Sequence, residues 1–325
     1  MAVVAGIDEA GFGPVLGPLV VSAAAFELPD ELAGQSLWRL LRGGVCCKPA
    51  RRGTRVAVAD SKKLYKGLRG KDGLKHLERG VLAMLAASGA KPGSLDELLS
   101  HIAPDAKGSA ALYPWYAGLP RPVLLPTAVS DTNVALAGNL LAKAMADAGV
   151  RLAAIRTEPV FVGEYNRMVT ATKNKSVTLL DVTSRLLMFL WRKFAGQNLL
   201  ITVDRQGGRV RYVAILRRLF ENWRLKVLDE DETHSAYRLC LDDLTAEIHF
   251  RVRAEQTDLP VALASMTSKY VRELFMGMLN RFWASHVPQL APTGGYYVDG
   301  RRFWAEVQSA VGRMGLDEQM LYRRR

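Results

Sequence analysis

The sequence has few cysteines and no long apolar run. Its 3 cysteines are Cys46, Cys47 and Cys240, and two adjacent cysteines with one distant cysteine form neither a disulfide framework nor a zinc-ligand spacing. No apolar run approaches the length of a membrane-spanning helix. The first residues also lack the basic segment and cleavage site of a secretory signal. We therefore expect a cytoplasmic protein with no membrane span.

Internal repeats and low-complexity segments are absent as well. The chain of 325 residues is 49% hydrophobic and 23% charged, which is ordinary for a globular protein that buries a sizeable core. The 44 Lys and Arg residues outnumber the 32 Asp and Glu residues, so the net charge is +12. This excess suits a polyanionic partner such as nucleic acid, although a basic composition that serves only solubility fits equally well.

Short apolar strand patterns alternate with longer helical patterns along the chain. This alternation predicts an α/β fold, in which a mixed central sheet is covered by helices on both faces. We predict strands at 3–7, 19–26, 56–59, 151–155, 199–204 and 225–228, and helices at 29–41, 74–87, 95–102, 130–148, 177–194, 210–223, 260–286 and 302–314.

Two segments look like additions to such a core. Frequent proline and glycine break up the beginning of the region at about 89–150, which we interpret as an insertion with a short helix. A second region, at about 230–253, alternates apolar and polar residues on either side of Asp242 and Asp243, which predicts a hairpin. We expect residues 1–325 to form a single catalytic domain that carries both additions.

Several carboxylates occupy positions from which they can bind divalent cations. Asp8 and Glu9 end the first apolar strand, and Asp204 ends a later one. Carboxylate oxygens are the ligands that Mg²⁺ and Mn²⁺ prefer. Each acid also has a structural interpretation, as a polar turn, a helix cap or, for Glu273, a solvated ion pair with Lys269 at i−4. A more specific pattern is needed to choose between these interpretations.

Residues 6–14 supply that pattern, because they read Gly-Ile-Asp-Glu-Ala-Gly-Phe-Gly-Pro. This segment closely resembles the opening signature of the type 2 ribonucleases H, the ribonuclease HII and HIII family. A second block of that family, Asp-Ser-Lys-Lys-Leu, stands intact at residues 60–64. The strand that ends at Asp204 is similar to the third block, and the helical segment 264–273 is similar to the fourth. The resemblance covers both ends of the chain and about half its length.

The resemblance implies a ribonuclease H-like fold with a metal site formed by Asp8, Glu9, Asp204 and Glu273. Two divalent ions, Mg²⁺ or Mn²⁺, would support in-line attack of water on a phosphodiester bond. The expected protein is an endoribonuclease that hydrolyses the RNA strand of RNA/DNA hybrids or ribonucleotides embedded in duplex DNA. The fourth acid is Asp in the HII branch and Glu in the HIII branch, so Glu273 favours HIII. We also expect a monomer.

The resemblance further implies a set of substrate-binding residues around the acids. Lysines of the second block would contact phosphates, which position a substrate without reading its sequence. Glycines of the first block would approach the 2′-hydroxyl, and a tyrosine after the fourth block would stack at the junction. The residues carried over in this way are Gly11, Phe12, Gly13, Ser61, Lys62, Lys63, Lys269 and Tyr296.

The sequence departs from the family pattern at three places. Phe12 replaces a basic residue between the two glycines, so it is expected either to stack on a base or sugar or to pack inward. Arg205 replaces the glycine that usually follows the third acid. The family's Gly-Tyr-Gly segment is matched only by a similar Gly-Gly-Tyr-Tyr at 294–297. These departures, together with the two additions, leave the target of the site open.

Three functions therefore remain in contention. The first is the ribonuclease H activity, the second is a metal-dependent nuclease of the same fold with a different nucleic-acid target, and the third is a non-catalytic nucleic-acid-binding protein. The full set of acids argues against the third, because unpaired carboxylates repel a phosphate backbone unless a metal ion is bound. Glu255 and Asp258 lie just before the predicted helix 260–286, so either can replace one of the four assigned acids.

Overall fold

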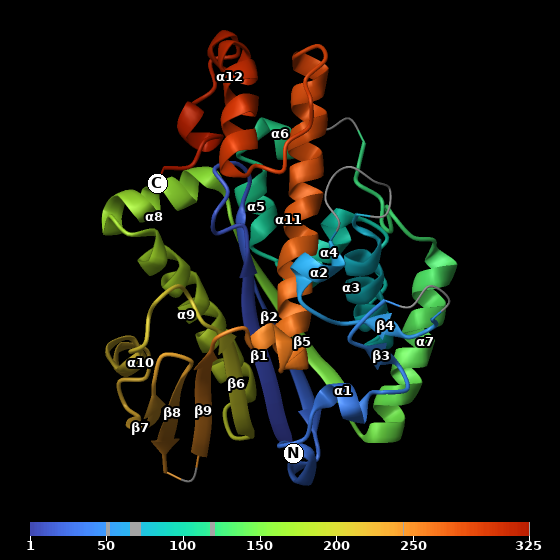
Figure 1. Cartoon of the computed structure of the whole chain (residues 1–325), viewed down its shortest axis with the longest axis vertical. Helices are drawn as coiled ribbons and strands as arrows, with labels where there is room; N and C mark the ends of the chain where they lie inside the picture. The colour runs from blue at the N-terminus through green and yellow to red at the C-terminus, as the bar shows by residue number, and fades with distance from the viewer. Residues whose placement is uncertain (50–52, 66–72, 118–120, 243, 325) are drawn as a thin grey trace.

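The computed structural model describes residues 1–49, 53–65, 73–117, 121–242 and 244–324. Within these ranges seven strands form one sheet in the spatial order β5-β2-β1-β6-β9-β8-β7 (Figure 1). The strands are Ala2–Ala10 (β1), Leu19–Leu28 (β2), Arg151–Val160 (β5), Asn198–Asp204 (β6), Arg224–Glu230 (β7), His234–Leu241 (β8) and Leu244–Arg251 (β9). Two short strands, Val45–Cys46 (β3) and Val56–Ala57 (β4), pair separately. The predicted mixed sheet of an α/β fold is confirmed.

The directions of the strands place the acids at one edge of the sheet. Strands β1, β6 and β9 are adjacent and parallel, whereas β2, β5, β8 and β7 complete the sheet through antiparallel pairs. Ile7 pairs with Val203, and Asp204 pairs with Arg251, so the carboxyl ends of the three parallel strands meet. In α/β sheets this edge is where ligands bind.

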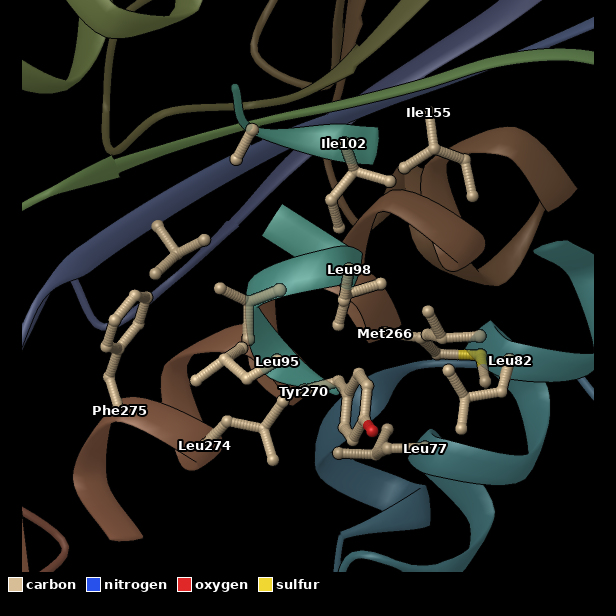
Figure 2. Packing of buried hydrophobic residues seen from close by; sticks show 14 of the residues in the cluster. Leu77, Leu82, Leu95, Leu98, Ile102, Ile155, Met266, Tyr270, Leu274 and Phe275 are labelled. Carbon is tan, nitrogen blue, oxygen red and sulfur yellow. The ribbon is translucent and has the colours of Figure 1, made fainter. Parts of the chain in front are cut away.

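One face of the sheet is covered by the helix α11, Leu259–His286. Its backbone lies so close to β1 that a Cβ atom added to Gly6 would stand 2.1 Å from the backbone nitrogen of Val261. The helices α3 (Lys75–Ala87), α4 (Leu95–Ile102) and α7 (Asp131–Ala148) belong to the same apolar cluster as α11. Figure 2 shows Leu98 of α4 and Leu77 of α3 pointing toward Met266 and Tyr270 of α11. The predicted insertion is therefore packed into the main core.

The opposite face is covered by helices from the second half of the chain. These are α8 (Val162–Thr172), α9 (Lys175–Phe194) and α10 (Val213–Leu219). Leu186 and Leu190 of α9 and Leu216 of α10 are buried in a second apolar cluster together with inward-facing residues of β1, β6 and β9. The helix α12, Tyr297–Arg313, ends the main helical part of the chain, and Figure 1 shows it beside the end of α11.

The predicted helices and strands agree with the structure where the apolar residues repeat with a clear helical or strand spacing. The helices at 95–102 and 131–148 match the predicted ranges closely, and β8 and β9 form the predicted antiparallel hairpin, although Asp243 lies outside the described residues. The single helix predicted at 29–41 is wrong. The structure has a 3₁₀ turn, Asp30–Leu32 (η1), and a short helix, Leu37–Leu40 (α1), separated by a segment that contains the helix-breaking Gly34.

Candidate active site

Four carboxylates gather at the shared edge of β1, β6 and β9. Asp8 and Glu9 lie just before the last residue of β1, and Asp204 is the last residue of β6. Glu255 lies in the 3₁₀ turn Ala254–Gln256 (η2), which follows β9. The backbone N–H of Ala254 donates a 2.9 Å hydrogen bond to the carboxylate of Asp204, which fixes η2 against the end of β6. The parallel register thus brings together acids that are far apart in the sequence.

The electrostatics of the acids show that they act on one another. Burial and the charge of Glu9 raise the pKa of Asp8 well above its ordinary value. Burial and the charge of Asp204 raise the pKa of Glu9 to about 7. Burial, the charge of Asp8 and the neighbouring Glu255 raise the pKa of Asp204 to about 8. Buried like charges of this kind need a cation or a proton to be stable.

The donor set fits hard divalent cations, because all four side chains offer carboxylate oxygens and none offers sulfur or imidazole. In the described part of the chain, however, no three His, Cys, Asp or Glu side chains are already arranged to hold one ion. The chemistry of the four acids and the raised pKa values of Asp8, Glu9 and Asp204 therefore favour Mg²⁺ or Mn²⁺, while the side chains would have to adjust as an ion binds.

The Asp-Ser-Lys-Lys-Leu block lies beside these acids. Asp60 caps the short helix Ser61–Leu64 (α2) by accepting a 2.9 Å hydrogen bond from the backbone N–H of Lys62. Ser265 of α11 donates a 3.0 Å hydrogen bond to the buried hydroxyl of Ser61. The ammonium group of Lys62 acts on Glu9, where its charge opposes the rise in pKa. Lys62 and Lys63 are exposed, so they are available to a phosphate at this edge.

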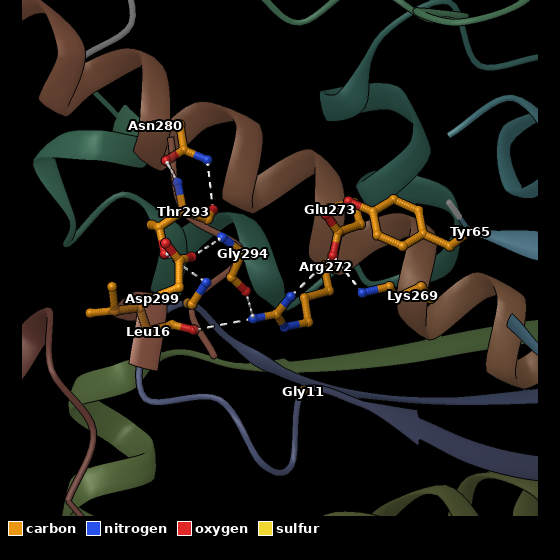
Figure 3. A network of polar contacts seen from close by, with 12 residues as sticks. Gly11, Leu16, Tyr65, Lys269, Arg272, Glu273, Asn280, Thr293, Gly294 and Asp299 are labelled. Carbon is orange, nitrogen blue, oxygen red and sulfur yellow. Dashed lines mark hydrogen bonds and ion pairs between the residues drawn. The ribbon is translucent and has the colours of Figure 1, made fainter. Parts of the chain in front are cut away.

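Glu273 has a different set of neighbours. Its carboxylate accepts hydrogen bonds of 2.7 Å from Lys269, 3.1 Å from Arg272 and 2.6 Å from Tyr65 (Figure 3). Burial opposes its ionisation, but Lys269 and Arg272 keep the pKa of Glu273 below its ordinary value. The charges that act on Glu273 are thus two cations, whereas the charges that act on Asp8 and Asp204 include Glu255. The structure brings Glu255 to the other acids and places Glu273 in an ion-paired network.

The same network shapes the glycine-rich loop between β1 and β2. Arg272 is fully buried and donates hydrogen bonds to the carbonyl oxygens of Leu16, at 3.2 Å, and Gly294, at 3.0 Å (Figure 3). Gly11 has a φ angle of +88°, and a Cβ atom there would stand 2.6 Å from Nε of Arg272. A glycine is needed at this position both for its backbone conformation and for the space above Arg272.

Residues near the end of the chain hold the loop from its other side. Arg323 is buried and donates hydrogen bonds to the carbonyl oxygens of Gly11, Pro14 and Gly17. Its backbone N–H donates a further bond of 2.8 Å to Val15. This role of Arg323 was not predicted from the sequence, because a lone arginine carries no local signal of the carbonyl groups that it will contact.

Phe12 and Tyr296 are the aromatic residues of the expected substrate-binding set, and they have different surroundings. Phe12 is half-buried against the second apolar cluster, and the ammonium group of Lys175 lies 5.1 Å from the centre of its ring. Phe12 therefore packs inward with one face under a cation. Tyr296 is 55% exposed, and its ring centre lies 5.8 Å from both Lys269 and Arg272. An exposed ring at this distance from buried cations offers a stacking surface.

Comparisons with known proteins bear on the fold. No protein-family model and no curated protein matches this sequence. Among solved structures, the ribonuclease H2 from Pyrococcus horikoshii OT3 is similar, with a TM-score of 0.50 and 14% identity over 98% of this chain and 92% of that chain. Because this likeness spans nearly the whole of both chains, the protein has a type 2 ribonuclease H-like fold, as the sequence motifs predicted.

Two further solved structures are similar at lower TM-scores. One is Bst-RNase HIII in complex with Mn²⁺, with a TM-score of 0.48 and 14% identity over 99% of this chain and 66% of that chain. The other is RNase HII from Archaeoglobus fulgidus in its complex with PCNA, with a TM-score of 0.41 and 17% identity over 99% of this chain and 94% of that chain. Separately, none of the helices in the described ranges combines the length and apolar character that crossing a membrane requires.

Proposed function

We propose that this protein is a metal-dependent endonuclease of the ribonuclease H type. Its substrate is the RNA strand of an RNA/DNA hybrid or a ribonucleotide embedded in duplex DNA. The observation that carries the proposal is the convergence of Asp8, Glu9, Asp204 and Glu255 at the ends of three adjacent parallel strands, where burial and neighbouring carboxylates raise the pKa of Asp8, Glu9 and Asp204. The type 2 ribonuclease H-like fold supports the same reading.

The four acids are the residues that would hold the metal. Bound Mg²⁺ or Mn²⁺ would lower the pKa of a water molecule and offset the charge that develops on the leaving oxygen. We assign Glu255 to this set in place of Glu273, because Glu255 acts on Asp8 and Asp204 while Glu273 is neutralised by Lys269 and Arg272. The sequence had left Glu255 open as a replacement for one of the four assigned acids.

The remaining residues position the substrate. Lys62, exposed and close enough to act on Glu9, contacts a phosphate beside the scissile bond, and Lys63 next to it contacts the same strand. Gly13 has open space where a Cβ atom would stand, so the backbone of the loop can approach a ribose closely. Lys269 and Arg272 hold Tyr296 by cation–π contacts, so that its exposed ring can stack on a nucleotide.

The test is cleavage of three labelled duplexes of one sequence, each with Mg²⁺, with Mn²⁺ and with a chelator. The duplexes are an RNA/DNA hybrid, DNA with one embedded ribonucleotide, and all-DNA. Metal-dependent cutting confined to the two ribonucleotide-containing duplexes supports the proposal, and their relative rates show which is preferred. Cutting of the all-DNA duplex would assign the site to a different nucleic-acid target, and binding without any cutting would make the protein a non-catalytic binder.

A further inference from the structure

A cavity of about 240 Å³ opens on the side of the glycine-rich loop. Its walls are residues 12–15 of the loop, Tyr165 of α8, Lys175 at the start of α9, and Arg323 and Arg324 near the end of the chain. Three parts of the sequence that are remote from one another therefore enclose one small space. The cavity adjoins the loop whose backbone leads directly from Asp8 and Glu9.

The described residues that line this cavity include three cations and no carboxylate. Arg323 is buried with its guanidinium bound to carbonyl oxygens and 4.6 Å from the centre of the Tyr165 ring, so its charge is met by neutral groups. Burial, followed by the charge of Arg272, lowers the pKa of Arg323 to about 9. A buried cation with neutral partners is stabilised by an anion placed next to it.

The other two cations keep donors that an anion can use. Lys175 is exposed and lies over the ring of Phe12, and a cation–π contact consumes none of the three N–H donors of a lysine. Arg324 donates hydrogen bonds to Thr170, at 3.3 Å, and Gln319, at 3.1 Å, which are neutral acceptors that leave its positive charge in place. An arginine has five N–H donors, so others remain.

We propose that this cavity binds a phosphate group of the nucleic-acid strand that crosses the glycine-rich loop, with Lys175 and Arg324 as the donors. A strand phosphate suits the cavity because its charge complements the three cations, while the rings of Phe12 and Tyr165 offer apolar walls to the attached sugar. The inference rests on the proposed function in one respect, since it takes nucleic acid as the ligand.

The experiment compares four proteins in binding a labelled RNA/DNA hybrid in the presence of a chelator, so that no cleavage occurs. They are the wild type, Lys175→Ala, the double variant Lys175→Ala with Arg324→Ala, and the control Lys193→Ala. Lys193 is a matched control because it is an exposed lysine at the other end of α9 whose ammonium lies 5.7 Å from the centre of the Phe194 ring. The measured quantity is the slope of log K against log salt concentration.

One lost phosphate contact makes this slope shallower by about 0.9. We expect a change of this size in the double variant, a partial change in Lys175→Ala, and a wild-type slope in the control. Equal slopes in the double variant and the control would overturn the inference, as would an equal loss in all three variants.

Cleavage by the wild type, measured separately with Mn²⁺, distinguishes this inference from the proposed function. Cleavage together with equal slopes removes the phosphate site and leaves the nuclease. A shallower slope in the double variant without any cleavage retains the phosphate site and removes the nuclease. Absence of both binding and cleavage in the wild type overturns both.

Discussion

The hydroxyl group of Ser265 on α11 donates a 3.0 Å hydrogen bond to the hydroxyl group of Ser61, which opens the short helix α2. The same hydroxyl group can turn to donate to the side chain of Asp8 instead, and this contact opposes the rise in pKa of that acid. One small side chain therefore connects a metal-ligand candidate to the block that carries Lys62. The connection is buried, so water does not replace it readily.

Replacement of Ser265 by alanine removes both bonds. We expect Ser265→Ala to weaken Mn²⁺ binding at pH 7, because Asp8 becomes harder to ionise, and to lower the free energy of unfolding by about 1–2 kcal/mol. Calorimetric titration with Mn²⁺ and urea denaturation measure the two effects. Wild-type Mn²⁺ affinity in a folded Ser265→Ala protein would show that this serine does not support the acids.

Replacement by glutamine should have different effects at Glu255 and at Glu273. Glu255→Gln removes a proposed metal ligand, so we expect cleavage to fall by about 100-fold or more while the free energy of unfolding stays near that of the wild type. Glu273→Gln leaves Lys269 and Arg272 without their counter-charge, so we expect the free energy of unfolding to fall by about 3–5 kcal/mol.

The two variants are compared by urea denaturation and by cleavage at a temperature at which both are folded. Asp8→Asn and Asp204→Asn serve as references, since both should abolish turnover and leave duplex binding largely intact. If Glu273→Gln abolishes cleavage and Glu255→Gln does not, the assignment of the fourth acid is reversed.

The raised pKa of Asp204 makes the stability of the metal-free protein depend on pH. The pKa of Asp204 is raised from its ordinary value of 3.8 to about 8 in the folded state, so between those two pH values the folded state holds this proton and the unfolded state does not. The contribution of Asp204 to the free energy of unfolding is therefore fully present below the unfolded-state pKa. It decreases as the pH rises from there toward 8. Each unit of pKa difference corresponds to about 1.4 kcal/mol.

Asp204→Asn removes this titration but keeps an oxygen that can accept from the backbone N–H of Ala254. We expect the metal-free variant to be more stable than the metal-free wild type by about 1–3 kcal/mol at pH 8.5, and the advantage to shrink at pH 5. Thermal denaturation in the presence of a chelator at the two pH values checks this. An advantage of the same size at both pH values would contradict the prediction.

Addition of Mn²⁺ should reverse the order of these two proteins. A ligand that binds only the folded state at 100 times its Kd stabilises that state by about 2.7 kcal/mol. We expect Mn²⁺ to raise the Tm of the wild type at pH 7.5 and to have little effect on Asp204→Asn, which lacks one carboxylate of the set. Ca²⁺-free buffers and a chelator-treated sample provide the baseline, and equal shifts in both proteins would place the bound ion elsewhere.

Two glycines, Gly6 packed against α11 and Gly277 within it, should have opposite effects on stability when they are changed to alanine. A methyl group at Gly6 would stand 2.1 Å from the backbone of Val261, so β1 and α11 would have to separate and we expect a loss of about 3 kcal/mol or more. Gly277 lies within α11 and has no heavy atom within 4 Å of an added Cβ atom. Gly277→Ala should therefore stabilise the helix by about 0.5–1 kcal/mol. Urea denaturation of both variants measures the difference in sign.

Apolar periodicity predicted the elements that bury one clear face. The helix at 95–102 was predictable because Ser94 caps it and Leu95, Leu98 and Leu99 point to one side. The helix Val162–Thr172 (α8) was not predicted, since its first residues continue the apolar pattern of the preceding strand β5 and it has no side-chain N-cap. The local sequence therefore predicts a helix when an N-cap residue and a helical spacing of apolar residues occur together. Where one of the two is missing, the type of element is ambiguous.

The sequence by itself determined which chemical groups are available and which fold they belong to. These groups are the carboxylates, the lysine pair and the glycines near the ends of apolar strands. Only the tertiary structure decided which acids meet. The parallel register of β1, β6 and β9 sets Asp8 beside Asp204 and brings η2 with Glu255 close to them. Glu273 instead pairs with Lys269 and Arg272 of its own helix, α11. Strand register and the position of a helix over a sheet depend on packing between distant segments, which no local pattern of residues records.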